Sequence, residues 1–361
     1  MSCTMARTPT SPSRRTAARK IAVIGAGIAG LACARTLMQA GHQVTLLEKS
    51  RGFGGRMACR STPFGSFDHG AQYFTVRDPR FEQVLALSPR VCRPWSANAV
   101  RVLDPLGRVA EATLDRRESH WVPVPGMNAL ARHWAQPLAA SGQTHLETRV
   151  TRIERDALDS ARWQLRIDGP RESVQVLSGF DQVMLAVPSV QAAELLRASG
   201  LNPDFTARVE QVQVAPCWTL MVAFPQAQQP GLAHLGPQWN AALSTHHRIA
   251  WLSRESSKPG RDPIERWTVQ ASAAWSDEHL NDDPQRVTAK LLKGFAEVTG
   301  IHATPAHAQV HRWLYAKTQV PLGTSHLWDR RTGLGLCGDW CIGHRVEDGF
   351  VSGLELALAA A

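Results

Sequence analysis

A glycine-rich turn between an apolar strand and a helix is the feature of this 361-residue sequence that most restricts its fold. The apolar residues 21–24 predict a buried parallel strand, and Gly25, Gly27 and Gly30 follow it at the spacing G-x-G-x-x-G. Glycines at this spacing permit a tight turn, a close approach of the backbone to a pyrophosphate, and close packing of helix on sheet. The free N–H groups and the dipole at the helix start favour an anion. This stretch therefore predicts a dinucleotide-binding, Rossmann-like unit.

Two further signals follow this turn. Glu48 stands at the end of a second apolar strand, where a carboxylate would bind the ribose hydroxyls. Gly54, Gly55 and Arg56 then form a second glycine pair with an arginine, which we expect to bind phosphate. The whole series resembles the flavin amine oxidase superfamily of FAD proteins, whereas a nicotinamide-binding unit normally lacks the second glycine pair. FAD is therefore favoured over NAD as the cofactor.

The charge of the chain argues against a nucleic-acid partner. The formal net charge is +9, but one polar N-terminal segment holds five of the cations, namely Arg7, Arg14, Arg15, Arg19 and Lys20. About +4 remains for the rest of the chain, which suits a protein that holds one anionic dinucleotide better than one that follows a nucleic-acid backbone.

Composition also bears on the compartment. Residues 1–19 are rich in Ser, Thr, Pro and Arg and contain no acid, so we expect a disordered extension or a misassigned start rather than a transit peptide. No apolar run approaches the length of a membrane span, so we expect no membrane partner. Seven scattered cysteines without a C-x-x-C pair predict reduced thiols and a cytoplasmic protein.

Hydrophobic periodicity predicts further strands and helices along the chain. Alternating residues 162–167 and 173–177 flank Asp168, Gly169 and Pro170 and predict a hairpin. Apolar runs predict buried strands at 44–47 and 180–187, and helical spacing predicts helices at 190–199 and 285–299. An antiparallel sheet is predicted from the alternating segments 217–224, 249–252 and 267–271.

These elements predict an α/β fold of two domains. Residues 333–356 again form an apolar strand, a turn and a helix, which only a discontinuous nucleotide domain explains. We therefore assign residues 20–75, 141–204 and 323–361 to an FAD-binding, Rossmann-like domain. Residues 76–140 and 205–322 are assigned to an α+β substrate domain built on the antiparallel sheet.

Motifs spread over about residues 20–358 resemble renalase and its bacterial relatives. They occupy residues 25–30, 54–57, 68–75, 121–128, 183–188, 311–316 and 338–352. The resemblance implies FAD bound in a GR2-type fold. It also implies a small-molecule substrate, a dihydronicotinamide dinucleotide: the 2- and 6-dihydro isomers of NAD(P) are oxidised to NAD(P)+ while O2 is reduced to H2O2.

The same resemblance supplies an expected cofactor site. In these relatives the segment that matches residues 68–75 runs alongside the flavin, and the residue that matches Val150 lies on the adenine. Asp339 is expected to hold a ribityl hydroxyl, and a helix opening at Asp348 to face the negative charge of a reduced flavin. The full expected set is Gly25, Gly27, Ile28, Ala29, Gly30, Glu48, Lys49, Gly55, Arg56, Met57, Gly70, Ala71, Gln72, Val150, Gly338, Asp339, Asp348, Gly349 and Phe350.

Three residues are expected to act on the substrate. Tyr73 and Trp313 match aromatic positions that line the substrate face of the flavin, where a flat nicotinamide has to stack. Gln270 stands where renalase places a histidine. Classical amine oxidases carry a lysine that holds a water at the flavin, and the comparable stretch 215–224 contains none.

Three other functions stay open at this point. They are an amine oxidase or desaturase on the same fold, an NAD-dependent dehydrogenase, and a non-catalytic flavoprotein. The missing lysine disfavours the amine oxidase, and the second glycine pair with Gly338 and Asp339 disfavours the dehydrogenase. No metal site is expected, because His307 and His311 have no third ligand nearby in sequence.

Overall fold

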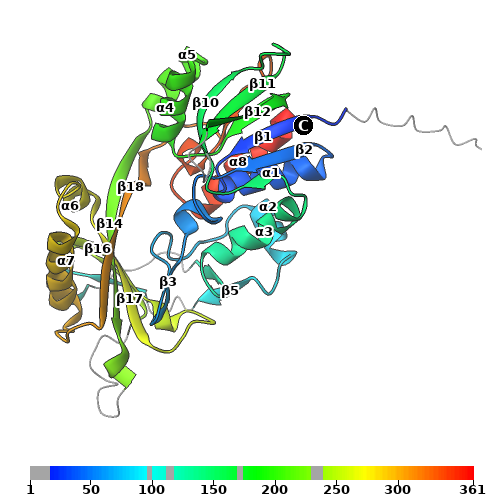
Figure 1. Ribbon diagram of the computed structural model, residues 1–361. Coiled ribbons are helices and arrows are strands. Elements are labelled where there is room, and N and C mark those ends of the chain that lie inside the picture. The colour runs from blue at the N-terminus through cyan, green and yellow to red at the C-terminus, as the bar shows by residue number, and fades with distance from the viewer. Residues whose placement is uncertain (1–16, 96–99, 111–117, 169–173, 229–238) are drawn as a thin grey trace, which may run out of the picture.

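The computed structural model describes residues 17–95, 100–110, 118–168, 174–228 and 239–361 (Figure 1). A six-stranded sheet carries the glycine turn. Its strands run in the order β19 (Leu327–Asp329), β20 (Leu334–Leu336), β13 (Gln182–Leu185), β1 (Lys20–Ile24), β2 (Gln43–Leu47) and β9 (Thr144–His145). All neighbours pair in parallel except β19 and β20. Residues from the two ends of the chain thus share one sheet.

Alternating residues of β1 bury both faces of this sheet. Ile21 and Val23 pack on the face covered by α1 (Ile28–Gln39), α3 (Asn128–Ala140) and α8 (Val346–Ala360). Ala22 and Ile24 pack on the other face, beneath a three-stranded antiparallel sheet and α4. That second layer consists of β10 (Arg149–Arg155), β11 (Trp163–Asp168), β12 (Val174–Phe180), α4 (Ser189–Ser199) and α5 (Pro203–Glu210).

Helices α1 and α8 cross at small residues. A Cβ on Gly353 would collide with the carbonyl oxygen of Ala29, and one on Gly349 would lie 2.7 Å from Ile28 Cγ2. Glycine at both positions therefore allows α8 to lie directly against the first turn of α1, as Figure 1 shows. The two helix starts are held close to each other by this packing.

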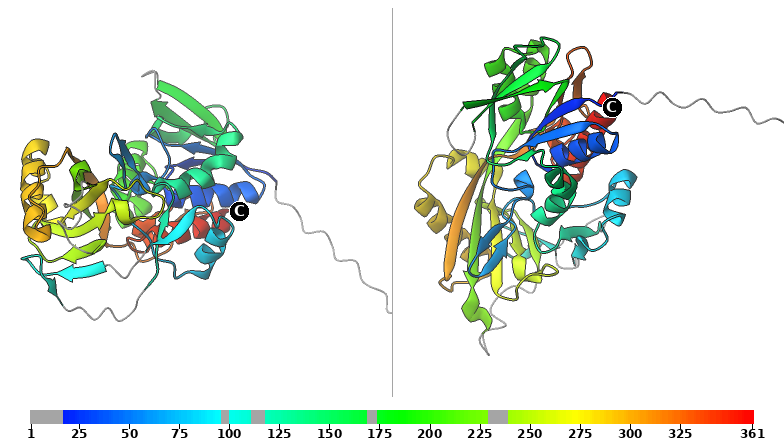
Figure 2. Two further views of the ribbon diagram at one scale, coloured as in Figure 1. Left: turned by 90° about the horizontal axis from the view of Figure 1, so that it is seen from below. Right: turned by 45° about the vertical axis from the view of Figure 1, so that its right-hand side comes forward.

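A seven-stranded sheet forms the second part of the molecule (Figure 2). Its order is β18 (His307–Val320), β14 (Gln213–Phe224), β17 (Glu265–Ala271), β16 (Ile249–Arg254), β15 (Ala241–Ser244), β6 (Val100–Leu103) and β7 (Val109–Ala110). Only β15 and β6 pair in parallel. Leu220 and Val222 of β14 face α7 (Pro284–Thr299), which lies with α6 (Ala273–Glu278) on the outer side of the sheet.

The opposite face of this sheet meets the glycine-turn side of the molecule. There Met221 and Ala223 pack on Phe67, which belongs to the short hairpin of β3 (Arg60–Thr62) and β4 (Gly65–Phe67). A second two-stranded pair, β5 (Cys92–Trp95) and β8 (His120–Pro123), lies nearby. Segments from both parts of the chain therefore meet between the two large sheets.

Most expected elements are present. The hairpin of β11 and β12 and the helices α4 and α7 are confirmed, and Asp283 caps α7 by accepting from the backbone N–H groups of Gln285 and Arg286. The hairpin's turn, 169–173, and the N-terminal residues 1–16 lie outside the described residues. No helix in the described ranges has both the length and the apolarity that crossing a bilayer requires.

The expected division differs from the structure in the segment 76–140. Helix α2 (Pro79–Ala86) and α3 pack on α1 and α8, because Phe81, Leu130 and Trp134 turn an apolar face to that core. Strands β6 and β7 of the same segment join the seven-stranded sheet. The segment is therefore divided between the two parts rather than belonging mostly to the second.

Candidate cofactor and substrate site

The glycine turn leaves room where a diphosphate would sit. The N–H of Gly25 donates to Leu47 O at 2.7 Å, and Gly25 has the left-handed φ of 106°. A Cβ on Gly30 would collide with the carbonyl oxygen of Gly25, so this glycine serves the packing of α1. A Cβ on Gly27, by contrast, would have no described atom within 4 Å. Among the described residues, no side chain caps the start of α1 and no acid lies in its first turn. The free N–H groups of this first turn therefore face the same space.

Glu48 has a second task beside the expected one. Its carboxylate is buried, and it accepts from the backbone N–H groups of Ala26 and Ser50, both at 2.8 Å. It therefore fixes the glycine turn itself. Each carboxylate oxygen still has a lone pair for a ribose hydroxyl. The open space at Gly27 and the position of Glu48 both fit the ADP half of FAD.

Arg56 and Asp339 were expected to bind different parts of the cofactor, and the structure pairs them. The Arg56 guanidinium donates to both oxygens of the Asp339 carboxylate, with Nη1 to Oδ2 at 2.9 Å. Gly54, with a left-handed φ of 117°, donates its N–H to Ala26 O and so brings Arg56 beside the glycine turn. A bidentate pair of this kind holds the end of β20 to the turn after β2.

The start of α8 needs a correction. The helix begins at Val346, two residues before the expected opening, and Asp348 accepts from the N–H of Arg345 at 2.8 Å. The N–H of Gly349 donates within the helix to Arg345 O, so the free N–H groups of this helix end belong to 346–348. Phe350 is placed in the core, where its ring stacks on Phe81 at 4.8 Å. A role of Phe350 toward FAD stays a prediction.

The segment from Asp68 to Tyr73, expected beside the flavin, lies against the second glycine pair. The N–H of Ala71 donates to Arg56 O at 2.9 Å, and a Cβ on Gly70 would collide with the same oxygen. Gly70 O accepts from the side-chain amides of Gln270 at 2.7 Å and of Gln72 at 3.2 Å. Gln270 therefore supports the backbone of this segment.

The other expected cofactor residues lie around the same turns. Ile28 and Ala29 open α1, Gly55 begins the short helix that follows Gly54, and the N–H of Gly338 donates to Ser352 Oγ at 2.9 Å. Lys49 is exposed after β2, Val150 is buried in β10, and the Met57 side chain is buried in the core. Their roles toward FAD stay predictions.

We call residues 68–73 the flavin-side segment. Tyr73 is its last residue, whereas Trp313 of β18 contacts it near its start, at His69, and no ring contact joins Tyr73 and Trp313 in the described structure. The rings of His120, Trp251 and Trp95 surround Tyr73 at 4.0, 5.5 and 6.4 Å, and we call these four side chains the aromatic wall. Trp313 instead stacks on His69 at 5.2 Å and donates Nε1–H to His69 O at 2.8 Å.

Burial sets the protonation of these groups. It lowers the pKa of His120 and, together with the nearby His311 and Arg60, lowers the pKa of His69 to about 3. It raises the pKa of Tyr73. Both imidazoles are therefore neutral near pH 7, and the phenol keeps its proton.

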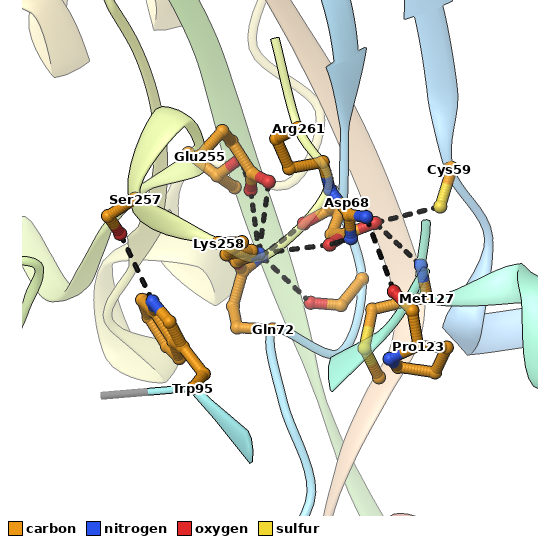
Figure 3. Close-up of polar contacts among 12 residues, drawn as sticks. Cys59, Asp68, Gln72, Trp95, Pro123, Met127, Glu255, Ser257, Lys258 and Arg261 are labelled. Atoms are coloured by element: carbon orange, nitrogen blue, oxygen red, sulfur yellow. Dashed lines mark hydrogen bonds and ion pairs between the residues drawn. The ribbon is translucent and has the colours of Figure 1, made fainter. Parts of the chain in front are cut away.

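Sequence reasoning missed a buried cluster of charges behind the flavin-side segment (Figure 3). The side chains of Asp68, Glu255, Lys258 and Arg261 are at most 1% exposed and form three ion pairs. We call these four residues the ion cluster. The regular spacing of Glu255, Lys258 and Arg261 was a usable signal, but such a run usually marks a solvated surface. His307 and His311 lie in β18, and the described ranges contain no group of side chains suited to a metal ion.

Comparisons with known proteins give the family and the fold of the chain. Residues 23–86 match the model of an NAD(P)-binding Rossmann-like domain, and residues 110–360 match that of flavin containing amine oxidoreductases. Among solved structures, a putative protoporphyrinogen oxidase from Exiguobacterium sp. 255-15 is similar with a TM-score of 0.71 at 14% identity, covering 95% of this chain and 99% of that one. Cyclohexylamine oxidase from Brevibacterium oxydans IH-35A has a TM-score of 0.68 at 14% identity, with coverage of 95% and 99%. At these identities the likeness shows the fold.

Curated relatives match over shorter stretches. Flavin-containing monooxygenase FMO GS-OX-like 6 from Arabidopsis thaliana is 27% identical over 168 residues, which are 44% of this chain and 32% of that protein. A 4,4'-diapophytoene desaturase from Staphylococcus haemolyticus is 39% identical over 79 residues, 19% of this chain and 16% of that protein. The chain thus spans about a third or less of these relatives. Because the amine oxidoreductase model matches well over half of the sequence, the chain belongs to the flavin-containing amine oxidoreductase family, whose members are FAD-dependent oxidoreductases.

Proposed function

We propose that this protein is an FAD-dependent oxidase of isomeric dihydronicotinamide dinucleotides, the 2- and 6-dihydro forms of NAD(P), with O2 as the electron acceptor and H2O2 as the product. The observation that carries the proposal is the aromatic wall around Tyr73, with the His120 ring at 4.0 Å and the Trp251 ring at 5.5 Å. Flat rings of this kind suit a flat nicotinamide. Bound FAD would supply the two-electron acceptor.

The lysines of the chain support the same choice. Strand β14 contains no lysine, although classical amine oxidases carry one in the comparable strand. The buried Lys258 does not replace it, because its three N–H groups are used by Asp68, Gln72 and Glu255. A dihydronicotinamide needs no such group, since hydride leaves it without prior loss of a proton.

Anaerobic mixing tests the proposal directly. The purified protein is mixed separately with 2-dihydro-NAD, 6-dihydro-NAD, ordinary NADH and common primary amines, while the flavin absorbance is followed. Rapid bleaching by either of the 2- and 6-dihydro isomers, followed by H2O2 when O2 is admitted, supports the proposal. An oxidised flavin after mixing with both dihydro isomers contradicts it.

Amine oxidation is the second candidate, favoured by the similarity to solved amine oxidases such as cyclohexylamine oxidase. Desaturation on the same fold is favoured only by the short match to a desaturase. Rapid bleaching by a primary amine in the same experiment would favour the first of these. We also propose a cytoplasmic location, supported by scattered cysteines of which the six in the described ranges are free thiols.

Flavin reduction by a dihydronicotinamide should depend little on pH between about pH 7 and 9. Burial lowers the pKa of His120 and raises that of Tyr73, so in this range His120 stays neutral and Tyr73 stays protonated. No group of the aromatic wall then changes charge. Rapid-mixing rate constants measured across this range check the expectation. An amine would behave in the opposite way, because its ammonium form, with a pKa of about 10.4, must first lose a proton and the rate would climb with pH.

Trp313→Ala should slow flavin reduction by about tenfold while FAD stays bound. The substitution removes the ring that stacks on His69 and the N–H donated to His69 O, and it leaves the glycine turn untouched. Single-turnover rates and the FAD content of the purified variant provide the two measurements. Trp313→Phe keeps a ring but lacks the N–H, so its rate of flavin reduction should lie between those of the wild type and Trp313→Ala. An unchanged rate in Trp313→Ala would place this side chain outside the substrate site.

A further inference from the structure

The ion cluster brings together charges from two distant segments. Asp68 follows β4, whereas Glu255, Lys258 and Arg261 lie in and after the short helix η4 (Glu255–Ser257) that ends β16. Lys258 is 2% exposed, and the side chains of Asp68 and Glu255 are completely buried. Figure 3 shows the ammonium group of Lys258 at the centre of these contacts. Charges buried this deeply need a partner for each donor and acceptor.

Lys258 uses its full donor capacity inside the molecule. Its Nζ donates to Asp68 Oδ2 at 3.0 Å, to Glu255 Oε1 at 3.0 Å and to Gln72 Oε1 at 3.2 Å. An ammonium group has three N–H bonds, so none remains for a water or a substrate. Lys258 is therefore suited to hold other groups in place and unsuited to exchange protons with a ligand.

Asp68 is held from several sides. Its carboxylate accepts from Arg261 Nη2 at 2.7 Å and from the N–H of Met127 at 2.8 Å, in addition to Lys258. Burial alone would raise the pKa of Asp68, but Lys258 and Arg261 outweigh it and hold the pKa at about 2. The carboxylate therefore stays ionised, and its contribution to stability is lost only as the pH falls below about 4 toward 2.

Gln72 connects the ion cluster to the flavin-side segment, and Trp95 connects it to the aromatic wall. Gln72, whose Oε1 accepts from Lys258, donates its amide N–H groups to Asp68 O and to Gly70 O within that segment. Behind the aromatic wall, the Lys258 Nζ lies 5.6 Å from the centre of the Trp95 ring. Trp95 in turn donates Nε1–H to Ser257 Oγ at 3.1 Å, next to Lys258 in the chain.

We propose that Lys258 is a positioning residue for the oxidoreductase reaction, which fixes the segment from Asp68 to Tyr73 against FAD through Asp68 and Gln72. Through these two contacts, the turn between β16 and β17 determines where Gly70, Ala71 and Tyr73 lie. A buried ion pair often adds little stability over apolar side chains of similar volume, so stability alone does not explain why these charges are buried. The inference depends on FAD binding and holds for any substrate that the enzyme oxidises.

The test compares Lys258→Met with Lys290→Met as a matched control. Lys290 lies on α7 and pairs with Asp282 at 3.3 Å. Three quantities are measured on the FAD-loaded proteins: the visible circular dichroism of bound FAD, the dissociation constant of FAD, and kcat separately from KM. Lys258→Met should change the dichroism spectrum, weaken FAD binding by about 10- to 100-fold and lower kcat more than KM. Lys290→Met should leave all three unchanged.

Two further variants separate positioning from a merely structural role. Lys258→Met leaves Glu255 buried without its cation, so Lys258→Met combined with Glu255→Gln removes the pair together and keeps the net charge. We expect this double variant to fold, yet to show the same altered dichroism and weakened FAD binding. Lys258→Arg keeps a cation at this position, so its dichroism spectrum and its FAD affinity should both be closer to the wild type than those of Lys258→Met. A folded double variant with wild-type dichroism and wild-type FAD affinity overturns the proposal, even if its melting temperature has changed.

Discussion

Gly27→Val is expected to give a folded protein that holds no FAD. Gly27 has φ −73° and ψ 177°, which are ordinary values for any residue, so valine introduces no backbone strain. Its side chain would extend into the space in front of α1, where no described atom lies within 4 Å of a Cβ. That space is where the helix start favours a diphosphate. We expect FAD affinity to fall by more than about 100-fold, since the diphosphate would lose its contact with the turn.

Gly30→Ala is the informative control for this experiment. A Cβ there would collide with the carbonyl oxygen of Gly25, so the variant should lose stability even without FAD. The melting temperature in the absence of FAD, together with the ratio of flavin to protein absorbance, distinguishes the two variants. Gly27→Val with a normal flavin content would refute the assignment of this turn to the diphosphate.

Glu48→Ala is expected to weaken FAD binding by about 1.5–3 kcal/mol, or roughly 10- to 150-fold, the range for a hydrogen bond to a charged group. The loss has two sources. The ribose would lose its acceptor, and the N–H groups of Ala26 and Ser50, both at 2.8 Å from the carboxylate, would lose theirs. The glycine turn then becomes less ordered before FAD binds. Titration of the FAD-free protein with FAD, followed by flavin fluorescence, measures the affinity.

Glu48→Gln separates these two sources. The amide keeps one acceptor oxygen but presents an NH2 group to the second backbone N–H, so an intermediate affinity is expected. Unchanged affinity in Glu48→Ala would return Glu48 to an ordinary carboxylate at the end of a strand.

The sequence predicted those parts of the fold that depend on near neighbours. The glycine spacing, the hairpin of β11 and β12 and the helix predicted at 285–299 are local patterns, and the structure confirms them. Residues 76–140 were assigned to the substrate domain, whereas α2 and α3 of this segment pack on α1 and α8, because an apolar helix face does not state which core it meets. The start of α8 at Val346 turns the Phe350 side chain toward Phe81, and a motif match does not give that rotation.

The site contacts that were missed join residues far apart in sequence. Arg56 and Asp339 are 283 positions apart, and Lys258 is 190 positions from Asp68. Each was visible as a charged residue, but no periodicity connects members of such a pair. Their pairing follows only from the order of strands in the two sheets.

The place of β20 in the six-stranded sheet has a consequence for how the protein is made. Strand β20 pairs with β13, and α8 packs on α1, so the glycine turn gains its last neighbours from residues 334–360. A ribosome adds these residues long after β1, β2 and β13 have emerged. Until then the edge of β13 is unpaired and the apolar face of α1 is open to water, a condition that favours aggregation or chaperone binding. We therefore expect FAD to be captured after this segment is synthesised, and a supply of free FAD late in translation to raise the yield of native protein.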